Sequence, residues 1–142
     1  EVIFLNGEIN MAATNSFLSN WSAGGVCVGI EVDSGRLHEF AYDKDGRRYT
    51  HNPLTNVCFR DYQIPRWDEI SAFAERTQKA FPYYKLLGPD IALTTSGPML
   101  YEINPRPDIG ASEQGGPLLK NRRVLSEFRK YDLLINDAQR RL

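Results

Sequence analysis

The chain of 142 residues has a length typical of one domain, and its hydrophobic content of 42% is sufficient for a buried core. The net charge of −1, from 17 basic and 18 acidic residues, provides no long-range attraction for a nucleic acid. No apolar run approaches the roughly 18 residues that a membrane span requires, and no signal peptide is visible. We therefore expect a cytoplasmic protein without a membrane span.

The N-terminal part of the chain shows the pattern of short strands separated by turns. "EVIFL" at 1–5 predicts a strand, which is followed by a turn at Asn6–Gly7 and a second strand. "VCVGIEV" at 26–32 is mostly apolar and predicts a well-covered strand, and the turn "DSG" leads into another at 36–43. Because the chain opens within a strand-like run, we expect it to be part of a longer protein.

The periodicity becomes helical after Pro65. Apolar residues recur at helical spacing between Trp67 and Phe81, charged residues take the opposite face, and Pro82 ends the segment. A second helix is expected near 121–139. Its predicted buried stripe consists of Val124, Leu125, Phe128, Tyr131, Leu134 and Ile135.

Two strands between these helices, at 90–95 and 99–104, are expected to form a hairpin. A three-residue loop, Thr95–Gly97, fits the turns in which glycine takes the left-handed position, and it would pair Thr94 with Pro98. The order of elements predicts an α+β fold, with an antiparallel sheet and flanking helices.

The hairpin register predicts a cluster of oxygen ligands. Asp90 would lie opposite Glu102, with Cβ atoms about 4.5–5.5 Å apart, and Asn104 would share the face of Glu102. Opposed carboxylates repel unless a cation neutralises them, and Mg²⁺ prefers oxygen ligands. The alternative is a solvated face without a metal. A two-residue Ser96–Gly97 loop would also separate the two acids.

Two cysteines and two histidines offer a possible separate site. Cys27 and Cys58 are consistent with two free thiols or with a disulfide. Together with His38 and His51 they could form a zinc-bound module, although no CxxC or HxxxH spacing supports one. Zinc content would test this alternative.

Four segments resemble, in the same order, motifs of the ATP-grasp ligases. "GPDIAL" followed by "GPMLYEINPRPD" is similar to the closing metal-binding hairpin of that family, an Asp, a turn and then Glu-x-Asn. "SNWSAGGVCVGIEVDSGRL" is similar to its Asn and Gly-Gly segment. "HNPLTN" and "IPRWDEI", followed by a helix and "LLGPDIAL", resemble the ATP-grasp branch associated with sugar transfer and polysaccharide genes. The resemblance covers roughly residues 1–120.

This resemblance implies a Mg²⁺- and ATP-dependent carboxylate ligase. Two Mg²⁺ ions would bridge the β- and γ-phosphates of the co-substrate ATP. A small carboxylate substrate would form an acyl phosphate, which an amine or similar nucleophile then attacks. By motif position, Asp90 would hold one ion, Glu102 both, and Asn104 the second.

Further residues receive roles by the same resemblance. Tyr101 would pack near the adenine, or be a core tyrosine, and Arg106 would bind phosphate or a substrate carboxylate, or be a surface residue beside Asp108. Asn20 with Gly24–Gly25 would line the substrate side, or form a tight entry into a strand. The catalytic residues stay unassigned.

The sequence departs from the family pattern in three ways, one of which is Pro89, where this branch usually has a tryptophan. Gly88 stands where many relatives have an arginine that stabilises the transferring charge, and Arg47, Arg48 and Arg60 are possible substitutes. The N-terminal half of an ATP-grasp domain has no counterpart within 1–142. We therefore expect a single partial domain, the C-terminal half, that is inactive as an isolated piece. The alternative is a non-catalytic binding or scaffold domain.

Overall fold

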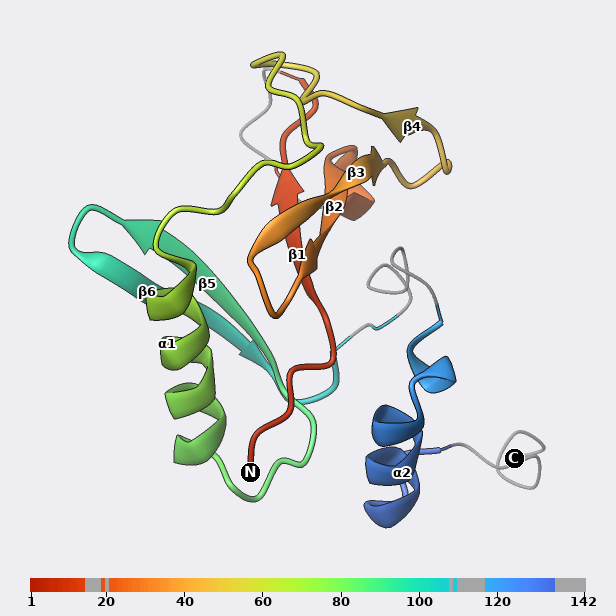
Figure 1. Cartoon of the computed structure of the whole chain (residues 1–142), viewed down its shortest axis with the longest axis vertical. Coiled ribbons are helices and arrows are strands. Elements are labelled where there is room, and N and C mark those ends of the chain that lie inside the picture. The colour runs from red at the N-terminus through yellow and green to blue at the C-terminus, as the bar shows by residue number, and fades with distance from the viewer. Residues whose placement is uncertain (15–18, 20, 108, 110–116, 135–142) are drawn as a thin grey trace.

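The computed structural model describes residues 1–14, 19, 21–107, 109 and 117–134 (Figure 1). They form two antiparallel sheets and two α-helices, which confirms the predicted α+β class. None of the described helices is long and apolar enough to cross a membrane. The strands are β1 (Gly7–Met11), β2 (Val26–Glu31), β3 (Arg36–Tyr42), β4 (Arg48–Tyr49), β5 (Gly88–Thr94) and β6 (Gly97–Asn104), and the helices are α1 (Trp67–Ala80) and α2 (Arg122–Lys130), with short 3₁₀ turns η1 (Trp21–Ala23) and η3 (Leu118–Lys120).

The larger sheet has four strands in the order β1-β2-β3-β4. Its second strand, β2, is the predicted apolar run, and its first five residues are buried. The register between β2 and β3 shifts between Val28 and Ile30. The residue between them, Gly29, has no room for a side chain, because a Cβ there would lie 2.5 Å from Nδ1 of His38.

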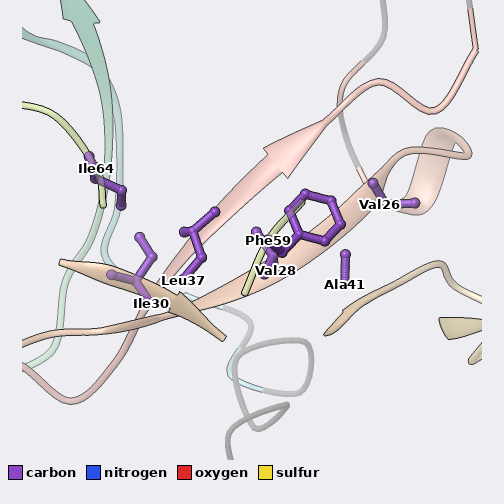
Figure 2. Packing of buried hydrophobic residues seen from close by; sticks show 7 residues of the cluster. All are labelled: Val26, Val28, Ile30, Leu37, Ala41, Phe59 and Ile64. Carbon is purple, nitrogen blue, oxygen red and sulfur yellow. The ribbon is translucent and has the colours of Figure 1, made fainter. Parts of the chain in front are cut away.

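The main core lies against this sheet (Figure 2). Residues from β2 and β3 supply most of it, and Phe59 and Ile64 join from the irregular segment that precedes α1. Trp67 and Ile70 of α1 pack against its edge. The buried members are Val26, Val28, Ile30, Leu37, Ala41, Phe59 and Ile64.

Helix α1 is fixed to the turn between β2 and β3 through its first residue. The indole of Trp67 lies over Gly35, where a Cβ would approach within 2.3 Å of the ring, and φ of Gly35 is +75°. The indole nitrogen donates a hydrogen bond of 3.0 Å to the carbonyl of Val32. A side chain at Gly35 would therefore both strain the turn and displace the helix.

The predicted strand at 1–5 is wrong, because β1 begins at Gly7, the residue expected to complete a turn. The preceding segment instead lies along the C-terminal helix. Leu5 packs against the cluster formed by Leu118, Val124 and Phe128, and Glu1 forms a surface ion pair with Arg123. The apolar character of this segment thus reflects packing rather than strand pairing.

Helix α2 is shorter than the predicted 121–139. Its N-cap is Asn121, whose side chain accepts hydrogen bonds from the backbone of Arg123 and Val124. It ends because Asp132 has a φ of +54°, and the amide of Leu133 bonds back to the carbonyl of Phe128 at 2.8 Å. Of the predicted stripe, Val124 and Phe128 are buried, Leu134 packs against them, Leu125 is half-buried, Tyr131 is exposed, and Ile135 lies outside the described residues.

Candidate functional site

The hairpin of β5 and β6 forms the second sheet, and α1 lies beside it (Figure 1). Its turn differs from the prediction, because Thr94 pairs with Gly97 rather than Pro98 and only Thr95 and Ser96 lie between them. The Thr94 hydroxyl closes this turn by donating to the carbonyl of Gly97 at 2.8 Å. Gly97 has a φ of +126°, a value that side-chain-bearing residues rarely adopt.

A β-bulge corrects the register before it reaches the acids. With Thr94 opposite Gly97, an unbroken ladder would place Asp90 opposite Tyr101. The register shifts between Asp90 and Ile91, so that Asp90 pairs with Glu102. Tyr101, the extra residue on β6, is 78% exposed. The predicted pairing of the two acids is therefore present, but through a shorter turn combined with a bulge.

Asn104 completes the set of oxygen donors at this end of the hairpin. It pairs with Gly88 in the ladder. Gly88 lies two residues before Asp90, and Asn104 lies two residues after Glu102. Since successive side chains of a strand alternate between faces, Asp90, Glu102 and Asn104 share one face. Both carboxylates are exposed. Two carboxylates and an amide are hard oxygen ligands, so the donor chemistry fits Mg²⁺.

The electrostatics at Asp90 agree with such a role. Partial burial, and then the charge of Glu102, raise the pKa of the Asp90 carboxyl above its ordinary value of 3.8. In the described part of the chain, no three or more His, Cys, Asp and Glu side chains gather closely enough to hold a metal. Asp90 and Glu102 place two negative charges side by side on the hairpin, and a bound cation would relieve their repulsion.

Asp90→Asn is expected to stabilise the metal-free protein at pH 7. Removing one of two opposed charges should raise the free energy of unfolding by about 0.2–1 kcal/mol, nearer the lower value because both carboxylates are exposed. The measurement is thermal unfolding of the full-length protein in chelator. A variant less stable than the wild type would show that Asp90 makes a stabilising contact instead.

The same difference should depend on pH. The pKa of Asp90 is higher in the folded than in the unfolded chain, so the ionised carboxylate destabilises the fold above the folded pKa. As the pH falls through the folded pKa, the folded chain takes up a proton first, and the wild type gains stability relative to Asp90→Asn. This gain should be complete below the ordinary pKa of 3.8.

Arg66 connects α1 to the tip of the hairpin. Its guanidinium forms two hydrogen bonds to Glu69, of 2.8 and 2.7 Å, and one of 3.2 Å to the carbonyl of Thr94. The hydrogen bonds to Glu69 raise the pKa of Arg66 and lower that of Glu69. The tip of the hairpin is therefore held to the helix, away from the end that carries the acids.

The other predicted site residues have different surroundings. Arg106 is exposed and has no ion-pair partner among the described residues, and Asp108 lies outside them. The possible substitutes for an arginine at position 88 lie at the four-stranded sheet: Arg60 pairs with Glu39, and Arg48 lies over the ring of Phe40 at 5.2 Å.

The predicted substrate segment has a backbone explanation in the structure. Gly24 has a φ of +95° and closes a turn on Trp21, while a Cβ on Gly25 would lie 2.3 Å from the carbonyl oxygen of Ser19. Both glycines are thus needed for the entry into β2, and a substrate role stays a prediction. Asn20 lies outside the described residues.

The zinc alternative gains no support from the described residues. Cys27 is buried in β2, whereas Cys58 is an exposed free thiol. Cys58 pairs through its backbone with His51, but no cluster of metal ligands includes them. His38 packs over Gly29 within the larger sheet.

The fold and the hairpin together define a class of protein: an α+β domain that presents two opposed carboxylates and an amide on one face of a hairpin. The model of the sugar-transfer associated ATP-grasp family matches residues 8–127. The chain therefore belongs to that family. Searches of curated proteins and of solved structures found no match. Membership makes this an ATP-grasp domain of the ligase or transferase type, in a family that generally uses ATP, Mg²⁺ and carboxylate substrates.

Proposed function

We propose that residues 1–142 are the C-terminal part of a Mg²⁺- and ATP-dependent carboxylate ligase. The observation that carries the proposal is the pairing of Asp90 with Glu102, with Asn104 on the same face, in a chain that belongs to an ATP-grasp family. The N-terminal half of the ATP clamp would come from a preceding segment of the natural protein. Residues 1–142 alone are expected to bind Mg²⁺·ATP weakly and to show no turnover.

The three oxygen-bearing residues divide the metal binding between them. Asp90 would hold one Mg²⁺, Glu102 would contact both ions, and Asn104 would complete the second. Mg²⁺ held by these residues would supply positive charge to neutralise the phosphate oxygens during the displacement. The hairpin contributes by holding its ligands at a fixed separation, since Asp90 and Glu102 are neighbours in one ladder.

The reaction would proceed in two displacements. An oxygen of the substrate carboxylate attacks the γ-phosphorus, and the bond between that phosphorus and the β–γ bridging oxygen breaks. The products of this step are ADP and an acyl phosphate. An amine or similar nucleophile then attacks the acyl carbon, releases phosphate and loses a proton. Arg106 would bind the transferring phosphate or the substrate carboxylate, because a guanidinium suits both anions.

The remaining assignments complete the picture of the bound substrates. Tyr101 would lie beside the nucleotide. Its ring is exposed at the bulge and is therefore accessible to a ligand. Asn20, Gly24 and Gly25 would border the substrate side. We also propose that the protein is located in the cytoplasm, where ATP is supplied. A role in polysaccharide biosynthesis would be in keeping with the description of the family as sugar-transfer associated.

The test uses the full-length natural protein. ATP binding, measured by calorimetry, is expected to require Mg²⁺ and to disappear in chelator. ADP release should depend on an added carboxylic acid from a panel, and hydroxylamine should trap the acyl phosphate as a hydroxamate. ATP binding of equal strength in chelator, or ADP release independent of any carboxylic acid, would contradict the proposal.

A non-catalytic binding or scaffold domain is the second candidate. It is favoured by Gly88, because this position carries no arginine and its side-chain space is filled by Pro107. A scaffold does not need two metal ions at the hairpin. Binding of Mg²⁺·ATP without any carboxylate-dependent ADP release would support this candidate over the ligase.

A further inference from the structure

Gly88, the first residue of β5, pairs with Asn104, the last residue of β6. Among the described glycines, those with positive φ are Gly24, Gly35, Gly46 and Gly97, and Gly88 is not one of them. Its backbone is therefore accessible to any residue, and the absence of a side chain requires a different reason.

That reason is the close approach of Pro107. A Cβ built on Gly88 would lie 2.7 Å from Cβ of Pro107, 3.5 Å from its Cγ and 3.7 Å from Cβ of Asn104. Real Cβ atoms do not approach another atom to 2.7 Å. The opposing Cβ of Pro107 belongs to a proline ring and not to the end of a flexible side chain. The ring of Pro107 therefore occupies the space of the missing side chain, on the face that Asn104 shares.

The short loop between Asn104 and Pro107 is thus held at both ends. Asn104 is paired in the ladder, and the ring of Pro107 lies so close to Gly88 that no space remains for a Cβ there. Within the loop, Pro105 and Pro107 have restricted φ angles, and the residues that precede them, Asn104 and Arg106, are restricted as well. The Pro-Arg-Pro segment has few other conformations available while Pro107 stays in place.

We infer that the contact between Gly88 and Pro107 is a positioning device for the metal–nucleotide site, which fixes Asn104 and Arg106 relative to Asp90. The inference rests on the proposed function. It also excludes an arginine at position 88, because the space for its Cβ is filled. Of the basic residues that the structure describes, Arg106 is the one that lies within this loop, two residues after Asn104 in the chain.

The experiment measures Mg²⁺·ATP affinity of the full-length protein by calorimetry, at a temperature where every variant is folded. Gly88→Ala should weaken binding about 10–100-fold, the range found when groups that orient metal ligands are changed. Gly7→Ala is the matched control, because Gly7 also lies in a strand without positive φ, and its added Cβ would meet only ordinary contacts of 3.4 Å. Its affinity should equal that of the wild type.

Substitutions at Pro107 identify the clashing atom. In a Pro107→Gly background the opposing Cβ is absent, so Gly88→Ala should change affinity by no more than about twofold. In a Pro107→Ala background the Cβ remains, and Gly88→Ala should still weaken binding about tenfold or more. The affinity of each double variant is compared with that of the single Pro107 variant in the same background. This comparison separates the effect of the steric clash from the effect of losing the rigid proline ring.

Two results would overturn the inference, and they differ. If the wild type binds ATP equally well without Mg²⁺, the proposed function fails and the inference fails with it. If the wild type requires Mg²⁺ but Gly88→Ala binds as tightly as Gly7→Ala, the inference alone is wrong. A loss caused only by destabilisation would appear in the unfolding temperature and leave the affinity of the folded protein unchanged.

Discussion

Glu102→Gln in the full-length protein is expected to abolish Mg²⁺-dependent ATP turnover while leaving the fold intact. Substitutions that merely reorient metal ligands cost about 10–100-fold, so the loss of a ligand proposed to contact both ions should exceed a hundredfold. The amide has nearly the shape of the carboxylate but lacks the charge. Asp90→Asn should have an effect of similar size, because it removes the other carboxylate of the pair.

The fold should survive because both side chains are exposed and repel each other in the absence of metal. Their unfolding temperatures in chelator should equal or exceed that of the wild type. Glu75→Gln is the matched control: it makes the same change in charge on the exposed face of α1, where Glu75 pairs with Lys79 at 2.5 Å. Turnover retained in either hairpin variant would remove that residue from the proposed metal site.

The sequence predicted the pairing of these acids for an incomplete reason. A three-residue loop would pair Asp90 with Glu102 directly, whereas the structure has a two-residue turn that displaces the register by one. The bulge at Tyr101 then restores it. A bulge depends on how the strand packs and twists, and the alternation of residue types carries little sign of it. The spacing from Asp90 to Glu102 was therefore more informative than the assumed turn.

The helices were predicted from periodicity, but their ends were not always clear. The helix after Pro65 ends as expected before Pro82. The C-terminal helix stops at Lys130, because Asp132 adopts a left-handed conformation that is more typical of glycine or asparagine. Apolar residues continue at helical spacing beyond Lys130, which led to the prediction of a longer helix. Leu134 instead lies past the end of the helix and still packs against the same cluster.

The irregular segment between β4 and α1 was the least predictable part of the core. It has neither the alternation of a strand nor the spacing of a helix, so periodicity gave no indication that Phe59 and Ile64 are buried. Contacts distant in sequence decide their burial instead. The amide of Phe59 bonds to the carbonyl of Thr50, and that of Ile64 bonds to the carbonyl of Gly35.

Phe59→Ala is accordingly expected to be the most damaging single core substitution. Phe59 is 2% exposed and is the largest of the fully buried side chains among the described residues. Truncation of a buried phenylalanine costs about 3–5 kcal/mol, a large share of the roughly 5–15 kcal/mol that stabilises a typical domain. Denaturant unfolding of the full-length protein would measure the loss, and Phe59→Leu should give an intermediate value.

Phe81→Ala is the control, because Phe81 is 40% exposed at the end of α1 and its truncation should cost much less. A cost below about 1 kcal/mol for Phe59→Ala would place the side chain outside the core.

The core variant and the site variant also differ in their effect on ATP binding and turnover. Phe59 belongs to the core of the four-stranded sheet, away from the oxygen ligands, so Phe59→Ala should lose binding only in proportion to the unfolded fraction. Glu102→Gln, by contrast, should lose turnover at every temperature at which the protein is folded.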